Sequence, residues 1–190
     1  MQASFLRSVR KLHRNTGILL FAFFFIIALT GLLLGWKKNS FGLILPATST
    51  GTSTQLSEWK SLEELNAIAD STLLAMVGNN ISTRLDRIDA RKDKGIVKFV
   101  YIQDYWEVQL DGATGKPMQI NQRRSDLIED LHDGSFFDLY FQTKGEPIKL
   151  IYTLIMSTAL IIFTITGFWL WYGPKQIRRK KAEKSTRSSG

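Results

Sequence analysis

Two long stretches without any charged residue stand out in the pattern of hydrophobic and polar positions along the chain. The first runs from Gly17 to Trp36 and the second from Leu150 to Pro174. A helix rises about 1.5 Å per residue, so roughly 20 apolar residues cross the hydrocarbon core of a bilayer. The pattern therefore predicts two transmembrane helices, one near each end of the chain, with a large polar segment between them.

The polar segment shows first a helical and then a strand-like pattern. Ser61 and Glu64 have the spacing of a capping box, and apolar residues follow at helical intervals up to Met76. Four stretches with β-branched, aromatic or alternating apolar residues then predict strands: 85–90, 96–102, 105–110 and 118–121. The expected structure is a small α+β domain with one helix, an antiparallel meander and a thin core. Its carboxylates are expected on turns and on solvent-exposed faces, and no residue pattern in it indicates catalysis.

Two further segments of the polar region have compositions of their own. Residues 46–55 are rich in Ser, Thr and Gly and predict an extended tether. Residues 126–141 are rich in aromatic and aliphatic side chains and come shortly before the second apolar stretch. This density favours either a segment that lies at the membrane interface or a core helix that docks onto the sheet, and one helix could do both.

These patterns predict a membrane α+β fold in which two transmembrane helices bracket a small domain. The chain divides into a basic N-terminus (1–16), a first transmembrane helix (17–36), a linker (37–55), the α+β domain (56–125), an interfacial segment (126–149), a second transmembrane helix (150–174) and a basic tail (175–190).

The distribution of charge predicts how the chain is oriented in the membrane. The net charge of +8 comes wholly from the two ends, because the segment between the apolar stretches carries a slight excess of acidic residues. Positively charged ends stay in the cytoplasm. Both termini are therefore expected inside, with the central domain on the periplasmic or other extracytoplasmic side of the inner membrane. The basic composition thus indicates topology, and we expect no binding to nucleic acid.

Three features narrow the functional classes further. The first apolar stretch is longer than the core of a signal peptide and lacks a small-residue cleavage site, so a retained anchor is expected. The chain has no cysteine, which excludes disulfides, iron–sulfur clusters and covalently attached c-type haem. Neither apolar stretch contains an acidic or basic residue, which argues against a proton- or ion-coupled transporter.

The order of motifs along the chain resembles the PepSY-associated transmembrane family. Three segments carry the resemblance: Leu12-His13-Arg14 with the span that ends Leu29-Thr30-Gly31-Leu32-Leu33-Leu34-Gly35-Trp36, the alternating strand and turn over 106–116, and Asp130-Leu131-His132-Asp133-Gly134 ahead of the span that ends at 166–171. The resemblance implies an extracytoplasmic PepSY domain. Larger members have about four spans, and some are haem-containing reductases of siderophore-bound iron or are linked to flavin reductase modules. This chain has two spans and no reductase domain.

His13 and His132 are the only two histidines, and both fall on positions that match the family pattern. Imidazole is a usual axial ligand of haem, so both are candidate ligands of a haem b. About 20 helical residues, or some 30 Å, separate their levels in the membrane. One haem would therefore need a symmetric dimer or a partner protein that supplies the missing ligand. In the alternative without haem, His13 binds lipid headgroups and His132 caps a helix end.

Small and hydroxyl-bearing residues in the two apolar stretches indicate helix packing. Gly31 and Gly35 form a G-x-x-x-G motif, which lets two helix backbones approach closely in lipid. Four hydroxyl side chains of the second stretch offer hydrogen bonds between helices: Ser157, Thr158, Thr164 and Thr166. The motif favours packing of the two spans within one chain, or else self-association or docking on a larger partner.

Two functional classes follow from these features. In the first, the chain is an accessory or binding subunit of a larger membrane complex and is not an enzyme on its own. In the second, it is a haem b electron-transfer protein that supports reduction of ferric siderophores in iron uptake. A third alternative is a regulator of extracytoplasmic peptidases, because PepSY modules in some propeptides are thought to act so. The expected partners are membrane lipids and either a second copy or a larger membrane protein.

Overall fold

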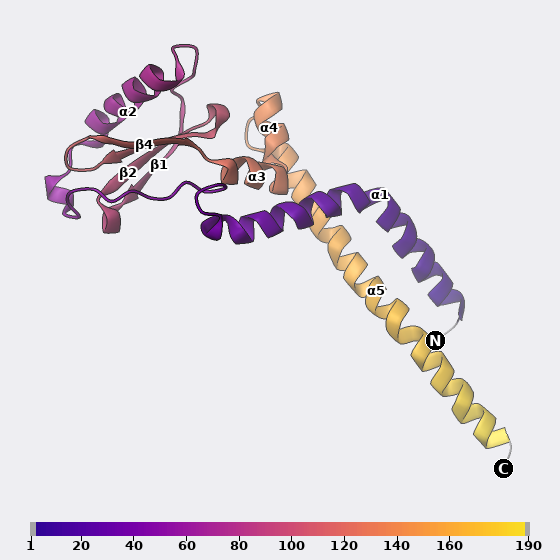
Figure 1. The fold of residues 1–190 in the computed structure, drawn as a ribbon. Helices are drawn as coiled ribbons and strands as arrows, with labels where there is room; N and C mark the ends of the chain where they lie inside the picture. The colour runs from indigo at the N-terminus through magenta and orange to yellow at the C-terminus, as the bar shows by residue number, and fades with distance from the viewer. Residues whose placement is uncertain (1–2, 189–190) are drawn as a thin grey trace. The chain divides into compact units, whose positions relative to one another are not determined.

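The computed structural model describes residues 3–188, so the outermost residues of the two predicted basic segments, 1–2 and 189–190, lie outside the described part. The main elements are α1 (Ala3–Trp36), α2 (Leu62–Val77), β1 (Leu85–Arg91), β2 (Ile96–Tyr101), β3 (Trp106–Asp111), β4 (Pro117–Gln122), α3 (Arg124–Asp133), α4 (Ser135–Phe141) and α5 (Pro147–Ser188) (Figure 1). They form two compact units. The helical unit comprises the chain up to Thr30 and from Asp130 onward, and the sheet unit comprises Gly31–Glu129.

The sheet unit is a four-stranded antiparallel meander with strand order β1-β2-β3-β4, covered on one face by α2. The capping box predicted at the start of α2 is present, with Glu64 N donating to Ser61 Oγ at 3.2 Å and Ser61 N donating to Glu64 Oε2 at 3.1 Å. The buried apolar core between α2 and the sheet consists of Leu65, Ala69, Leu73, Val97, Phe99, Tyr101, Val108 and Leu110. The predicted α+β architecture is confirmed.

The opposite face of the sheet carries buried polar side chains, and here the expectation of solvent-exposed carboxylates is wrong. Glu107 and Asp111 are 0% and 2% exposed. Residues 46–55 bind this face instead of forming a free tether. Gln109 Nε2 donates to Ala47 O at 2.9 Å, and Thr52 N donates to Asp111 Oδ2 at 2.9 Å. Residues 46–55, hereafter called the strap, therefore supply hydrogen-bond partners to buried polar groups of β3.

Two glycines allow the strap to approach the sheet closely. Gly51 N donates to Lys94 O at 2.7 Å, and a Cβ added to Gly51 would lie 2.2 Å from Gly95 O. Gly95 has a φ of +69°, which side chains rarely tolerate, and its own added Cβ would lie 2.6 Å from Ser53 O. Backbone contact of this kind leaves no room for a side chain at either position.

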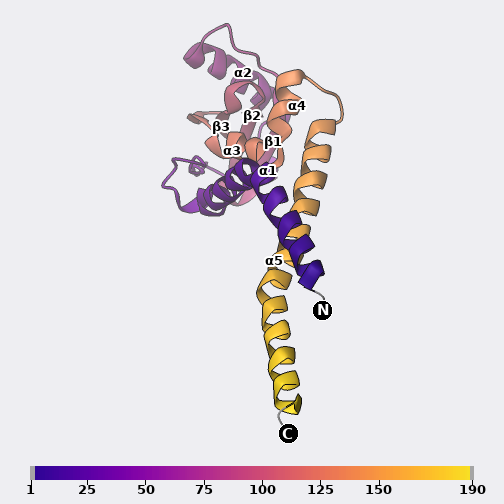
Figure 2. The same ribbon diagram turned by 90° about the vertical axis from the view of Figure 1, so that its right-hand side faces the viewer.

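In the helical unit, α1 and α5 pack side by side and run antiparallel (Figure 2). The start of α1 meets the later part of α5, where the rings of Phe5 and Trp169 lie 6.5 Å apart. Further along α1, the ring centroid of Phe23 lies 6.3 Å from that of Tyr152, near the start of α5. Only 6% and 11% of the most apolar 18 residues of the two helices are buried, whereas the core helix of a soluble protein is mostly buried. Both are long and apolar enough to cross a membrane.

The start of α5 is fixed by the short helix that precedes it. The carboxylate of Asp138 in α4 accepts hydrogen bonds from Ile148 N at 3.1 Å and Lys149 N at 2.7 Å. It thereby satisfies amide groups that have no partner inside α5. Pro147 occupies the first helical position, where its missing N–H costs nothing. The later part of the predicted interfacial segment, from Asp130 to Lys149, therefore belongs to the helical unit.

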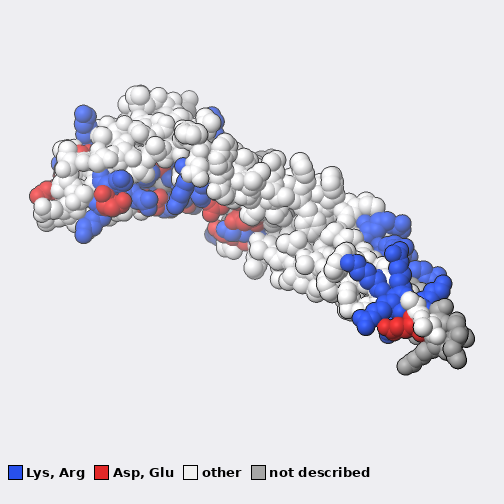
Figure 3. Space-filling model, turned by 60° about the horizontal axis from the view of Figure 1, so that its bottom comes forward, with Lys and Arg blue, Asp and Glu red and all other residues white. Residues whose placement is uncertain are grey.

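The basic ends continue the two apolar helices rather than forming separate segments. α1 begins at Ala3 and α5 ends at Ser188, well outside the apolar stretches. Figure 3 shows Lys and Arg side chains gathered near the beginning of α1 and on the later part of α5, while the helical surface beside them is free of charge. An uncharged belt next to a basic end is the surface expected of helices that leave a bilayer on its cytoplasmic side.

Candidate functional site

His13 lies in the N-terminal third of α1 and is half-buried against α5. Its Nδ1 lies 2.8 Å from Thr166 Oγ1. Its ring packs on Phe163, with the two ring centroids 4.2 Å apart. A Cβ added to Gly167 would lie 3.7 Å from His13 Cε1, so this glycine leaves room for the imidazole. One helix thus supplies the histidine and the other supplies the niche that holds it.

His132 lies in the last turn of α3 and contacts α1 in the same way. Its Nδ1 lies 2.9 Å from Thr30 Oγ1. The residues that follow it hold the end of α3 against α5: Asp133 pairs with Lys149 at 3.0 Å, and an added Cβ at Gly134 would lie 2.8 Å from the Tyr152 ring. The histidine is therefore positioned by contacts on both sides of the helix end.

Asp133 and Lys149 form an ion pair beside His132, and folding shifts the pKa of both groups. Burial alone would raise the pKa of the Asp133 carboxyl, but hydrogen bonds from Ser135 and Lys149 outweigh burial and hold that pKa below its usual value. The pKa of Lys149 is raised, first by its hydrogen bond to Asp133. Both groups are therefore charged at neutral pH, and the segment that carries His132 stays tied to α5.

The two histidine–threonine pairs share one local geometry. Thr30 Oγ1 donates to Ile26 O at 2.7 Å, and Thr166 Oγ1 donates to Ile162 O at 2.7 Å. In both cases the carbonyl belongs to the residue four positions earlier in the same helix. Each threonine hydroxyl thus contacts its own helix and, at the same time, a histidine from another element. The arrangement is reciprocal, because α1 carries His13 and also the threonine that contacts the second histidine.

The two pairs lie at different levels of the helical unit. Thr30, which contacts His132, comes 17 residues after His13 in α1. At 1.5 Å per residue, the two contacts are about 25 Å apart along the helix. Each histidine therefore belongs to a site of its own, and a single chain offers one imidazole to each.

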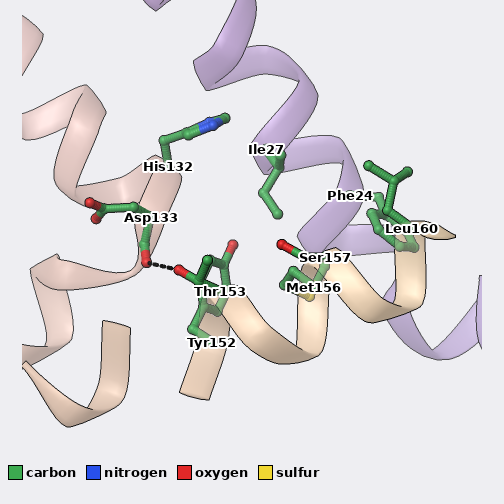
Figure 4. Close-up of a pocket in the computed structure, with 9 residues that line it drawn as sticks. All are labelled: Phe24, Ile27, His132, Asp133, Tyr152, Thr153, Met156, Ser157 and Leu160. Carbon is green, nitrogen blue, oxygen red and sulfur yellow. Dashed lines mark hydrogen bonds between the residues drawn. The ribbon is translucent and has the colours of Figure 1, made fainter. Parts of the chain in front are cut away.

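Each site has a cavity beside its histidine. The cavity at His132 measures about 260 Å³ and is lined mainly by apolar side chains of α1 and α5 (Figure 4). Figure 4 shows the imidazole of His132 pointing from α3 toward α1. A more open cavity of about 450 Å³ lies beside His13. Small-molecule sites usually enclose about 300–1,000 Å³. The cavity at His132 is below this range, and both are open on one side.

The two histidines fit one half of a bis-histidine haem site. Among residues 3–188, neither Nε2 atom has a hydrogen-bond partner, so each ring keeps one nitrogen for a ligand. The cavity at His132 is too small to enclose a haem within one chain. His13 and His132 would each supply one axial ligand, and a second chain would have to supply the other ligand and close the pocket.

The predicted glycine motif, Gly31 and Gly35, lies in the last two turns of α1. Among residues 3–188, no atom lies within 4 Å of a Cβ added to Gly35. The close approaches to glycine in the helix pair are instead at Gly17, whose added Cβ would lie 2.8 Å from the Phe163 ring, and at Gly173, whose added Cβ would lie 2.5 Å from Leu6. A packing role for Gly31 and Gly35, within one chain or against another chain, stays a prediction.

The residues that sequence reasoning missed are those that hold the histidines. Thr166 was expected only as one of several hydroxyl groups in the second span, and Thr30 had no assigned role. One signal could have found them. Both apolar stretches contain the same dipeptide, Thr30-Gly31 in the first and Thr166-Gly167 in the second. A repeated polar side chain inside an apolar span indicates a shared contact.

The sheet unit holds a buried network of ion pairs. Arg123 binds the carboxylate of Glu107, which is fully buried, and its Nε lies 2.9 Å from Asp126 Oδ2. Lys98 approaches the same glutamate at 3.6 Å, and Arg87 lies 2.6 Å from Asp126. Within residues 3–188, no group of three or more His, Asp or Glu side chains is arranged to hold a metal ion. The network joins the sheet to the start of α3.

Comparison with known families gives one match that spans nearly the whole chain. The model of the family described as the PepSY-associated TM region matches residues 2–187. A comparison with curated proteins finds no match. The family match covers both apolar helices, the sheet unit and both histidine–threonine pairs.

Proposed function

Because the chain belongs to the PepSY-associated TM family, we propose that this membrane PepSY protein is an accessory subunit of a larger membrane assembly. In this proposal it contributes one histidine to each of two sites that a second chain completes. The observation that carries the proposal is the half-built state of both sites. Each imidazole is fixed at Nδ1, has no partner at Nε2 within residues 3–188, and borders a cavity that is open on one side.

The composition of the open side supports a partner that is itself embedded in the membrane. The residues that line the cavity at His132 include Phe24, Ile27 and Leu160, and Leu160 is 55% exposed. Apolar side chains around an imidazole suit another transmembrane helix better than a water-soluble protein, because the carboxylate that lines the cavity, Asp133, is already paired with Lys149. A second copy of the chain and a larger membrane protein both meet this description.

Photo-crosslinking at the rim of the cavity tests the proposal. A photoreactive amino acid at Leu160 is expected to give one protein adduct of defined mass in native membranes. The neighbouring Ile161 is the matched control, because it is 60% exposed and does not line the cavity. An adduct near twice the chain's mass of 21.6 kDa identifies a second copy, and any other single mass identifies a different partner. Equal adducts at both positions, or none at either, would contradict the proposal.

A second candidate function is electron transfer through a haem b, and the open Nε2 atoms favour it. A neutral imidazole nitrogen without a hydrogen bond is the donor that haem iron takes in membrane helices. A bound haem b would supply one-electron transfer, while this chain's own residues would hold the two imidazoles and surround them with apolar side chains. Reduction of ferric siderophores would be one use of such a carrier.

The haem candidate is tested by a dithionite-reduced minus oxidised spectrum of the chain purified in mild detergent from a haem-replete host. The expected result is a b-type α band, with up to one haem for every two chains at each histidine level. His132→Ala is expected to remove the haem at one level and His13→Ala the haem at the other. A flat spectrum from a preparation that crosslinks as a second copy would rule out this function.

A further inference from the structure

The two threonines beside the histidines also determine which nitrogen of each ring carries its proton. We infer that Thr30 and Thr166 are positioning residues that hold His132 and His13 in the neutral Nδ1–H form, with Nε2 aimed away as the free base. The inference rests on the proposed function for its use, since it explains how the chain keeps two ligand nitrogens available. Its evidence is independent of that use, because it comes from hydrogen-bond geometry alone.

A threonine hydroxyl has a single proton to donate. Thr30 Oγ1 lies 2.7 Å from Ile26 O, and a carbonyl oxygen can only accept, so the hydroxyl donates its proton there. What remains on Oγ1 is lone-pair density. Because His132 Nδ1 lies 2.9 Å from that same oxygen, Nδ1 must be the donor and must carry the hydrogen. A neutral imidazole has one such hydrogen, so Nε2 is left as the acceptor.

The threonine at the other site makes the same two contacts. Thr166 Oγ1 donates to Ile162 O at 2.7 Å, and His13 Nδ1 lies 2.8 Å from Thr166 Oγ1. The two threonines occur in different helices, and the histidines come from α1 and α3. The same contact occurs at both sites with the same atoms and at nearly the same distances. This recurrence indicates a shared structural role and not a chance of packing.

The surroundings explain why a hydroxyl serves here better than a carboxylate. A carboxylate partner would also accept from Nδ1, but it would bring a charge into an apolar span at high cost. A threonine that donates to its own helix is a neutral acceptor and brings no charge into the span. The histidine thus gains the orienting contact that ligand imidazoles commonly have, without a buried charge.

Nitrogen NMR on the full chain tests the inference without any haem. The chain has two histidines, so a histidine-free affinity tag and 15N-histidine labelling give a spectrum of two rings. The spectra are recorded at pH 8.5. Long-range proton–nitrogen correlations in detergent are expected to show a protonated Nδ1 and an unprotonated Nε2 in both rings.

Reciprocal variants supply the control within each sample. Thr30→Val keeps the shape of the side chain and removes its oxygen, so the ratio of the two tautomers of His132 is expected to shift about tenfold toward Nε2–H, the worth of one hydrogen bond. His13 stays unchanged in that sample and reports that the helix pair is intact. Thr166→Val is expected to shift the tautomers of His13 toward Nε2–H and to leave His132 unchanged. Thr30→Ser and Thr166→Ser keep the hydroxyl and are expected to give the wild-type spectrum.

Two outcomes would overturn the inference: an Nε2–H form in the wild-type chain, or valine variants with unchanged tautomers. The first would mean that the hydroxyl donates to the ring instead of to its helix. Both are distinguishable from failure of the proposed function. If no partner is crosslinked at Leu160 but the tautomers respond as expected, the function is wrong and the role of the threonines stands.

Discussion

Replacing Arg123 by methionine is expected to speed amide hydrogen exchange in β2 and β3 by about two orders of magnitude. Arg123 neutralises the carboxylate of Glu107, which is fully buried, and removing one partner of a buried ion pair costs about 3–5 kcal/mol. A loss of about 3 kcal/mol in opening free energy corresponds to roughly 150-fold faster exchange of the protected amides. Exchange is measured by mass spectrometry on the full chain in mild detergent.

The neighbouring arginine provides the matched control. Arg124 is exposed, and its side chain has no ion pair or hydrogen bond within residues 3–188. Arg124→Met is therefore expected to change the opening free energy by no more than about 0.5 kcal/mol. Adding Glu107→Gln to Arg123→Met should recover part of the loss, since the carboxylate that the arginine neutralised is then gone. Equal exchange rates in the two single variants would show that the network contributes nothing.

The same network predicts how stability responds to acid. Burial alone would raise the pKa of Asp126, but hydrogen bonds from Arg123 and Arg87 outweigh it and hold the pKa below its usual value. A carboxyl whose pKa is lowered by folding stabilises the folded state above its unfolded pKa, about 3.9, and this stabilisation is lost as the pH falls through the lowered value. In Arg123→Met that pKa rises, so calorimetric unfolding should show the loss at a higher pH than in the wild type.

Much of the fold could be predicted from the sequence, because its strongest signals are local. An uncharged stretch of 20 residues is sufficient to indicate a transmembrane helix, and the pair Ser61 and Glu64 is sufficient to indicate where α2 begins. The predicted meander is confirmed for the same reason, since alternation over 105–110 and the turn after it describe a hairpin without reference to any distant residue.

The strap shows where local signals end. A Ser-, Thr- and Gly-rich segment has the same composition whether it is free or hydrogen-bonded, so residues 46–55 looked like a tether. What holds them is the polar side of β3, where Gln109 and Asp111 read as solvent-facing by alternation. Alternating polar and apolar residues in a strand predict a solvent-exposed face only if no other segment covers that face. Here a segment more than 50 residues away in the sequence covers it.

The candidate sites show the same limit more strongly. His13 and His132 could be selected from the sequence because imidazole is scarce in this chain and both match the family pattern. Their partners could not, because Thr166 is 153 residues from His13 and Thr30 is 102 residues from His132. Contacts at such separations depend on how two helices are aligned. A G-x-x-x-G motif indicates close packing in lipid but does not say which helix packs against it, so the motif could not supply this alignment.

In oriented membrane vesicles, a cysteine in the sheet unit and cysteines at the two basic ends are expected to react from opposite sides. The wild-type chain has no cysteine, so each single variant carries one reactive thiol on a silent background. Asn79 lies in the exposed loop after α2, Ser8 is exposed near the start of α1, and Thr186 is exposed near the end of α5. A membrane-impermeant maleimide should label Asn79→Cys in right-side-out vesicles and Ser8→Cys and Thr186→Cys only in inside-out vesicles.

Labelling is expected to be nearly all-or-none, because positive charge at both ends of the chain orients the two helices together. Four basic residues precede the first apolar stretch and seven follow the second, and cytoplasmic retention of such clusters orients short membrane proteins. Labelling of Ser8→Cys and Thr186→Cys from opposite sides would mean that only one helix crosses the bilayer. Labelling of all three from one side would mean that neither does. In either case His13 and His132 could not lie at two levels of a membrane-spanning pair, and both half-sites would need a different explanation.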